Sequence, residues 1–241
     1  NAGNSIASGG NYNVVVGDDS GTDLTTGDKN TLVGYAAGAN TSTASNNTFI
    51  GSESGFTNIT GTSNVGVGYR SLLTSTGNSN TAVGYASGTA VTTGIQNTLI
   101  GALAGDALTD ADYNVAVGSY ALTSDTLGSR AVAIGYAALE NQNFTTATNS
   151  YNIGIGWNTG GAITTGTGNT LIGSLAGDAL TVSVDNVAVG ANALDAQNFT
   201  TATNAYNVGV GHAAGGGVTT GIQNTLIGGL AGDVLSDADF N

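Results

Sequence analysis

Short apolar segments recur along the chain, and each of them begins one residue after an Asn, as in Asn97-Thr98-Leu99-Ile100-Gly101. We number each repeat from its Asn as position 0. Position +1 is Val, Ile or Thr and position +3 is Val or Ile in every complete repeat. Because side chains alternate between the two faces of a strand, +1 and +3 share one face. The pattern therefore predicts one β-strand per repeat, with +3 in the interior and +2, as at Leu99, facing solvent or a partner chain.

The Asn at position 0 returns every 17 residues over most of the chain, with one step of 16 and two of 21. A short fixed period is typical of stacked units that bury their apolar faces only against their neighbours. Seventeen residues give a contour of about 55 Å, enough for two strands of about five residues and two turns. We predict an all-β parallel β-solenoid, or β-roll, of about fourteen 17-residue coils, forming a single domain over residues 1–241.

Two further positions indicate turns. Position +4 is Gly in all thirteen complete repeats, which is typical of a turn that needs a positive φ or has no room for a Cβ atom. An apolar residue such as Leu108 precedes the next Asn by six positions, and a Gly such as Gly94 often precedes it by three. We interpret these positions as a second short strand and a second turn.

The Asn side chains at position 0 would stack above one another from coil to coil. Their amides would then form a hydrogen-bonded ladder along the axis, although Asn is also a common turn residue and plain turn chemistry is the alternative. Neither interpretation makes them a catalytic site. The row comprises Asn13, Asn30, Asn47, Asn64, Asn80, Asn97, Asn114, Asn152, Asn169, Asn186, Asn207, Asn224 and Asn241, with Ala131 in one place.

Two coils are longer by four residues, and the extra length lies in the similar segments 141–149 and 196–204. Insertions in solenoids form loops on one side, where recognition often occurs, although a tolerated surface bulge is the alternative. We predict that both loops project from the same side and present Phe144 and Phe199 to a ligand.

Composition and charge exclude several classes of function. The net charge of −13 disfavours nucleic acid and anionic membrane surfaces as partners, and no apolar run is long enough to span a bilayer. Cys is absent, so disulfides and thiolate metal sites are excluded. The chain begins without Met and ends at the Asn of an unfinished repeat, so we expect it to be a segment of a longer fibre protein.

Candidate chemistry is sparse. The single histidine, His212, lies at position +5, where other coils carry aromatic rings, so we expect an exposed side chain and no catalytic role. Asp106, Asp110 and Asp112 are weak candidates for Ca²⁺ ligands, with a solvated acidic edge as the alternative. No nucleophile, base and orienting group can be assigned, so we expect no enzyme activity and no cofactor.

Aromatic rings occupy two positions beside the strand ends, +5 and −1. Exposed rings with Asn and Thr nearby can stack on sugars, so Tyr136, Trp157 and His212 join Phe144 and Phe199 as candidate receptor contacts. The alternative is that the rings cover the coil corners or pack between chains.

The segments 114–122 and 131–139 resemble the S-V-A-I-G-x-x-A/S repeat of the YadA-like heads of trimeric autotransporter adhesins. The segment 80–88 also resembles glycine-rich repeats of bacteriophage tail fibres. The resemblance implies a left-handed β-roll, three chains side by side and a role in attachment. The period of 17 residues departs from the period of about fourteen in the adhesin heads.

We therefore expect a non-enzymatic structural and adhesive fibre segment, of a virion tail fibre or a cell-surface adhesin. It would be an extracellular homotrimer that attaches to a host receptor or surface glycan. A monomeric ice- or carbohydrate-binding solenoid is the alternative. An ice binder would be expected to carry regular Thr rows, whereas Thr at +1 gives way to Val or Ile in about half of the coils.

Overall fold

Each repeat forms one three-residue strand over positions +1 to +3. The β-branched residues at +1 and +3 favour extended backbone, and the glycine at +4 ends the strand. The computed structural model describes residues 2–6 and 9–241, and no helix occurs among them. The strands that follow position 0 are β1 (Val14–Val16), β2 (Thr31–Val33), β3 (Thr48–Ile50), β4 (Val65–Val67), β5 (Thr81–Val83), β6 (Thr98–Ile100), β7 (Val115–Val117), β9 (Val132–Ile134), β11 (Ile153–Ile155), β12 (Thr170–Ile172), β14 (Val187–Val189), β16 (Val208–Val210) and β17 (Thr225–Ile227).

The chain divides into two compact units, Asn1–Asn114 and Val115–Asn241. In the first unit each strand pairs in parallel with the strand of the next repeat, in unbroken order from β1 to β6. In the second unit β7, β9, β11, β12, β14, β16 and β17 pair in the same way. Each unit is therefore a parallel β-solenoid of about 17 residues per turn. The described residues contain about thirteen turns, one fewer than the fourteen expected.

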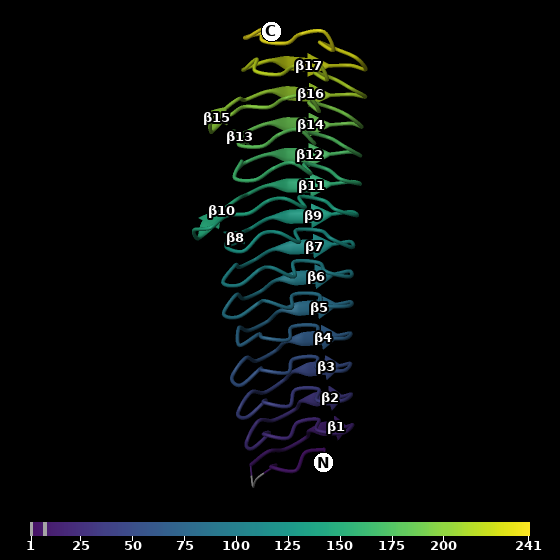
Figure 1. The fold of residues 1–241 in the computed structure, drawn as a ribbon, viewed down its shortest axis with the longest axis vertical. Coiled ribbons are helices and arrows are strands. Elements are labelled where there is room, and N and C mark those ends of the chain that lie inside the picture. Colours follow the sequence, from purple (N-terminus) through teal and green to yellow (C-terminus); the bar gives the residue numbers. More distant parts are fainter. Residues whose placement is uncertain (1, 7–8) are drawn as a thin grey trace. The chain divides into compact units, whose positions relative to one another are not determined.

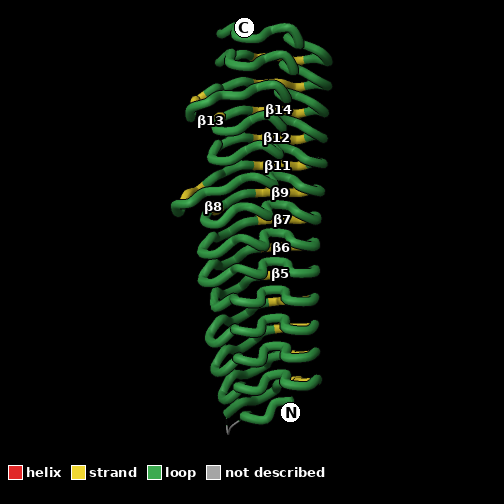
Figure 2. Tube along the Cα trace, in the orientation of Figure 1, coloured by secondary structure: helices red, strands yellow, loops and turns green. Residues whose placement is uncertain are grey.

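Figures 1 and 2 show the strands stacked above one another within each unit, with turns and loops completing every coil. The 16-residue and 21-residue steps do not disturb the register. Position +1 still pairs with position +1 at Val65 and Thr81, and at Val132 and Ile153. The change in length is therefore absorbed outside the sheet.

The interior lies on the +2 side of the strands. Leu99 is fully buried, whereas Ile100 is 39 % exposed, and Leu171 and Ile172 differ in the same way. The prediction that +3 faces inward was therefore wrong. The expectation that Leu99, Leu171 and Leu226 face solvent or a partner chain was wrong as well, because all three are buried inside their own coils. Both faces of the strand are apolar, so alternation alone did not identify the inner one.

Residues at +2 and +8 fill the narrow interior together, and their sizes compensate. Where +2 is Leu32, +8 is Gly38, and a Cβ atom on Gly38 would lie 2.7 Å from Leu32 Cδ2. Where +2 is Gly66, +8 is Leu72, which is fully buried. The variation at +2, which suggested a tolerant outer surface, is thus complementarity between the two walls of a thin coil.

The glycines at +4 are required by both conformation and space. Their φ angles lie between 123° and 140°, where other residues rarely occur. A Cβ atom on Gly34 would lie only 2.6 Å from the carbonyl oxygen of Gly51 in the next coil. This column of glycines therefore lets successive coils stack at the spacing that the sheet imposes.

The other side of an ordinary coil contains turns and bends instead of the second strand that we expected. Short strands occur there only in and next to the two long coils, among the residues that the structure describes. These are the parallel pairs of β8 (Gly128–Ser129) with β10 (Thr148–Asn149) and of β13 (Ser183–Val184) with β15 (Thr203–Asn204). Figure 1 shows β10 and β15 projecting from the same side of the second unit, as predicted for the two loops.

Candidate functional site

The outer surface of the strands is a regular feature of both units. In each unit we call this surface the sheet face and define it as the +1 and +3 side chains of the strands that follow position 0. Every one of these side chains is Val, Ile or Thr, and none is fully buried. Ile50, Ile100, Ile134 and Ile172 are each between 36 % and 40 % exposed.

The sheet face carries no charge, although the chain carries a net charge of −13. Three residues at about 3.3 Å each and a strand spacing of about 4.8 Å give about 50 Å² per coil, or about 300 Å² in each unit. Uncharged apolar patches of this size on a protein surface are commonly sites of interaction. Because the pattern repeats from coil to coil, any partner would meet a regular lattice of methyl and hydroxyl groups.

Aromatic rings border the sheet face at position +5, immediately after the turn glycine. Tyr69 and Tyr85 stack with ring centroids 5.5 Å apart, and Tyr120 at +6 meets Tyr136 edge to face at 5.7 Å. Tyr136 and Trp157 are about half exposed, and His212 is exposed at the same position. Three of the five proposed receptor contacts therefore lie at one type of corner, within the second unit.

One exposed ion pair accompanies these rings in the first unit. Arg70 Nε lies 2.6 Å from Glu53 Oε2, and the guanidinium lies 5.0 Å from the centre of the Tyr69 ring. The hydrogen bond to Glu53 raises the pKa of Arg70 above its usual value. The pair is solvent-exposed, so it orders the corner without adding much stability.

The Asn row lies inside the coils and forms an amide ladder. Asn47 donates its backbone N–H and its Nδ2 to Asn30 Oδ1, at 3.0 and 3.2 Å, and donates Nδ2 to the carbonyl oxygen of Gly61 at 2.8 Å. Similar bonds recur along both units, for example between Asn169 and Asn152. The row's amides from Asn30 to Asn224 are buried, so they serve the stack of coils and are not exposed to a ligand.

The ladder is interrupted at Ala131, which has no side-chain amide. A buried polar cluster of Asp125, Gln142 and Asn152 replaces the missing hydrogen bond. Asn152 Nδ2 donates to Gln142 Oε1 at 2.8 Å, in place of the amide oxygen that Ala131 lacks. Gln142 Nε2 in turn donates to Asp125 Oδ2 at 2.6 Å. Sequence reasoning missed this cluster, although an Asp six residues before position 0, in a column that is mostly apolar, was a signal for it.

Asp125 is fully buried and accepts several hydrogen bonds. Its Oδ1 accepts the backbone N–H groups of Gly128 and Phe144, both at 3.0 Å. Burial raises the pKa of Asp125, whereas the hydrogen bonds from Gln142, Phe144 and Gly128 act in the opposite direction. Through its hydrogen bonds to Gln142 and Phe144, the Asp125 carboxylate holds the first long loop against the preceding coil.

The two long loops differ in what they present. Phe144 is only 5 % exposed, so the expectation that it contacts a receptor was wrong for this ring. Its backbone is held by Asp125 and Thr126, and the ring packs next to Gly128 inside the loop. Phe199 in the second loop is partly exposed.

The acidic side chains considered as Ca²⁺ ligands have structural partners. Asp110 accepts a hydrogen bond from Thr93 Oγ1 at 2.6 Å, and Asp112 accepts the backbone N–H of Ile95 at 2.8 Å. Asp106 is partly buried and also has an interaction partner. Within residues 2–6 and 9–241 no group of three or more His, Asp or Glu side chains is placed to hold a metal ion.

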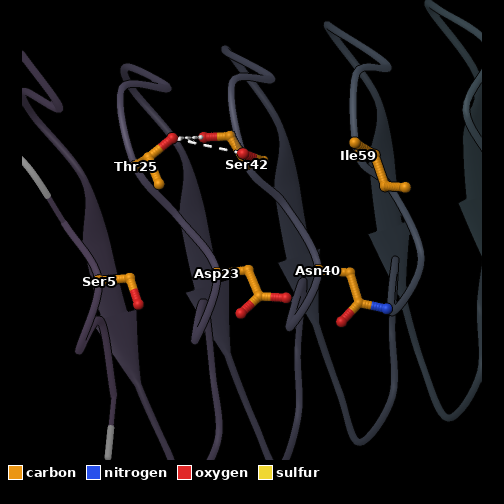
Figure 3. Close-up of a pocket in the computed structure, with 6 residues that line it drawn as sticks. All are labelled: Ser5, Asp23, Thr25, Asn40, Ser42 and Ile59. Atoms are coloured by element: carbon orange, nitrogen blue, oxygen red, sulfur yellow. Dashed lines mark hydrogen bonds between the residues drawn. The ribbon is translucent and has the colours of Figure 1, made fainter.

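A surface groove of about 540 Å³ lies on the side of the first unit away from the sheet face. Thr25 Oγ1 donates to the carbonyl oxygen of Ser42 at 3.1 Å, so this hydroxyl already serves the contact between coils (Figure 3). Asp23 is the single ionisable side chain of the lining, so the groove offers no acid and base pair. The lining residues are Ser5, Asp23, Thr25, Asn40, Ser42 and Ile59.

No helix in the described part of the chain is long and apolar enough to cross a membrane. Comparison with protein-family models finds no match, and a search of curated proteins finds none either.

Proposed function

We propose that the chain is a non-enzymatic structural and adhesive fibre segment that assembles side by side as a homotrimer. It would belong to a virion tail fibre or a cell-surface adhesin, be extracellular and attach to a host receptor or surface glycan. The observation that carries this proposal is the sheet face, an uncharged and partly exposed lattice of Val, Ile and Thr side chains. A left-handed winding belongs to the same proposal.

The sheet face suits a second and third copy of this chain for two reasons. Chains that each carry a net charge of −13 repel one another, and contact through a face without charged residues keeps their carboxylates apart. Apolar contact also removes from water the β-branched groups that a monomer leaves exposed, at roughly 25 cal/mol per Å². The exposed Tyr136 and Trp157 remain beside this contact as candidates for stacking on a sugar.

Substituting Ile100, Ile134 and Ile172 with Lys tests the assembly. All three side chains point outward, so the coils should still fold, as followed by circular dichroism, while sedimentation equilibrium should change from trimer to monomer. Ile59→Lys is the control, because Ile59 is even more exposed than these three residues but lies on the other side of the coil. A wild-type chain that sediments as a monomer would rule out the trimer.

The test of attachment uses the assembled trimer. Tyr136→Ala and Trp157→Ala should reduce binding to cells or to an array of neutral glycans while sedimentation remains unchanged. Unaltered binding by this double variant would exclude the rings as receptor contacts.

One observation favours the second candidate, a monomeric ice- or carbohydrate-binding solenoid. The Thr side chains at +1 share the outward face with Val or Ile at +3, for example Thr98 with Ile100, and this combination recurs in six coils. Outward rows of Thr, Val and Ile can contact a ligand with a regular surface, such as ice, whereas buried Thr side chains could not. A monomer that produces thermal hysteresis, lost in Thr98→Lys but kept in Ile59→Lys, would support this function over the fibre.

A further inference from the structure

One interior column changes from apolar to polar in three successive coils of the first unit. At position +11 the chain has Leu24, then Thr41, Asn58 and Ser75, and then Val91, and all five side chains are fully buried. Thr41 Oγ1, Asn58 Oδ1 and Ser75 Oγ have no hydrogen-bond partner among the described residues. Three unpaired polar atoms in neighbouring coils therefore share one buried column.

Such atoms need a partner. Native proteins pair nearly all buried hydroxyl and amide groups, either with protein groups or with ordered water. Asn58 already uses its Nδ2 to donate to the carbonyl oxygen of Gly61 at 2.9 Å, which leaves its Oδ1 as the unpaired atom. The protein groups near these three atoms therefore leave them unsatisfied.

The spacing of the coils identifies the kind of partner. Adjacent coils lie about 4.8 Å apart, and a long side chain can close this gap directly, as Gln142 does to Asp125 at 2.6 Å. The oxygen atoms of Thr41, Asn58 and Ser75 make no such direct bond to one another. Two hydrogen bonds of about 2.8 Å that meet at the tetrahedral angle of one water molecule span about 4.6 Å. We propose that the stacked, unpaired oxygen atoms of Thr41, Asn58 and Ser75 hold a row of buried water molecules, each bridging two successive coils.

Water fits this column better than a metal ion does. The two hydroxyl groups both donate and accept hydrogen bonds, and water can satisfy both roles. Calcium takes six to eight oxygen ligands, usually with carboxylates among them, and no carboxylate occupies this column in the first unit. Ser75 also has two side-chain heavy atoms where Leu24 has four, so its side chain fills less of the interior than the Leu side chain does.

The buried side-chain amide of Gln197 shows where no row of water is expected. Both amide atoms of Gln197 are unpaired, but its neighbours in the +11 column are Leu180 and Val218. A water molecule is stable in an interior only with two to four polar partners. No polar side chain lies one coil away from Gln197 in this column, so no water molecule can bridge two coils there, and the proposed row is confined to Thr41, Asn58 and Ser75 in the first unit.

Water–protein cross-relaxation measured by NMR on the full chain tests the proposal directly. We expect long-lived water signals at the backbone amide protons of Thr41, Asn58 and Ser75, and none at those of Leu108 and Val218 in the apolar part of the column. Absence of these signals at all three polar positions would overturn the proposal.

Thr41→Val provides an independent test, because it removes the hydroxyl group and nearly preserves the shape of the side chain. If Thr41 holds water, the melting temperature should fall by about 2 °C or more, as a hydrogen-bonded group is lost. If its hydroxyl is unpaired in a dry interior, the substitution removes a buried polar group and the melting temperature should rise. A rise or an unchanged value would overturn the proposal.

Thr159→Val calibrates this measurement. Thr159 Oγ1 donates to the carbonyl oxygen of Gly173, so its loss reports the effect of removing a known buried hydrogen bond. The combined variant Thr41→Val, Asn58→Leu and Ser75→Val should also abolish the water signals. If that variant does not fold, the single substitution at Thr41 still decides.

Discussion

The two long coils contain nearly the same loop sequence but have different interiors. In the first, Gln142 lies between Asp125 and Asn152 and bonds to both. In the second, the equivalent Gln197 follows Leu180 in its column, and its amide has no partner. The glutamine at this position of the loop is therefore hydrogen-bonded in the first long coil and has no hydrogen-bond partner in the second.

The ladder explains the difference. The first long coil has Ala131 at position 0, so Asn152 needs another acceptor and finds it in Gln142. The second has Asn186 at position 0, whose Oδ1 accepts the backbone N–H of Asn207 at 3.2 Å. In a solenoid the environment of a residue is thus set mainly by residues one coil away, and similarity within a coil does not ensure a similar role.

Removing the glutamine amide should affect the two coils in opposite directions. Gln142→Leu leaves Asp125 and Asn152 each short of one buried hydrogen bond, so we expect the free energy of unfolding to fall by about 3 kcal/mol. Gln197→Leu removes a buried amide without a partner and should leave stability unchanged or raise it by about 1 kcal/mol. Urea unfolding of both variants measures this, and equal losses would contradict the comparison.

Installing the missing carboxylate should make the second coil resemble the first. Leu180→Asp places a carboxylate in the +11 column one coil before Gln197, just as Asp125 lies one coil before Gln142 and accepts its hydrogen bond. The substitution should destabilise the chain overall, since it buries a charge, but with a favourable coupling to Gln197 of about 2 kcal/mol. A double-mutant cycle with Gln197→Leu measures the coupling, and a value near zero would show that the Asp and Gln columns do not act as a pair.

Restoring the ladder should make Gln142 less important. Ala131→Asn supplies the amide oxygen that the row lacks, so it should recover about 1 kcal/mol of the stability lost in Gln142→Leu. The remaining loss would come from the unpaired Asp125. If Ala131→Asn recovers nothing, Gln142 does not substitute for the ladder amide.

The smallest expected effect is a dependence on pH. Burial raises the pKa of Asp125, so the folded state binds its proton more tightly than the unfolded state, in which the pKa is about 3.9. The contribution of protonated Asp125 to the free energy of unfolding is therefore fully present below the pKa that Asp125 has in the unfolded state. It is lost as pH rises through the pKa that Asp125 has in the folded state. We expect the stability of the wild type relative to Asp125→Asn to fall as pH rises through this window.

Urea unfolding at a series of pH values checks this sign. Of the hydrogen bonds to Asp125, the one from Gln142 lowers the pKa of this carboxyl group most. Gln142→Leu removes it, so the pKa of Asp125 should rise further and the loss of stability should extend to higher pH. A relative stability that rises with pH would show that the hydrogen bonds to Asp125 outweigh its burial.

Much of the architecture could be predicted from the repeat. The Asn period and the glycine at +4 predicted parallel stacked coils, because each coil can bury its apolar residues only against similar neighbours. The projection of both loops from one side followed from the same register. The inner face could not be identified in this way, because Leu99 and Ile100 are both apolar and either parity satisfies the pattern.

The sequence by itself therefore determined the period, the parallel stacking, the turn glycines and the rings at the corners. Only the tertiary structure decided which side of each strand is inside, because that depends on how Gly38 makes room for Leu32 across the coil. It also decided that Phe144 is buried and that Asp125 meets Gln142, since these contacts join residues in different coils. Local pattern fixes a coil, whereas the packing between walls and between coils fixes what the coil exposes.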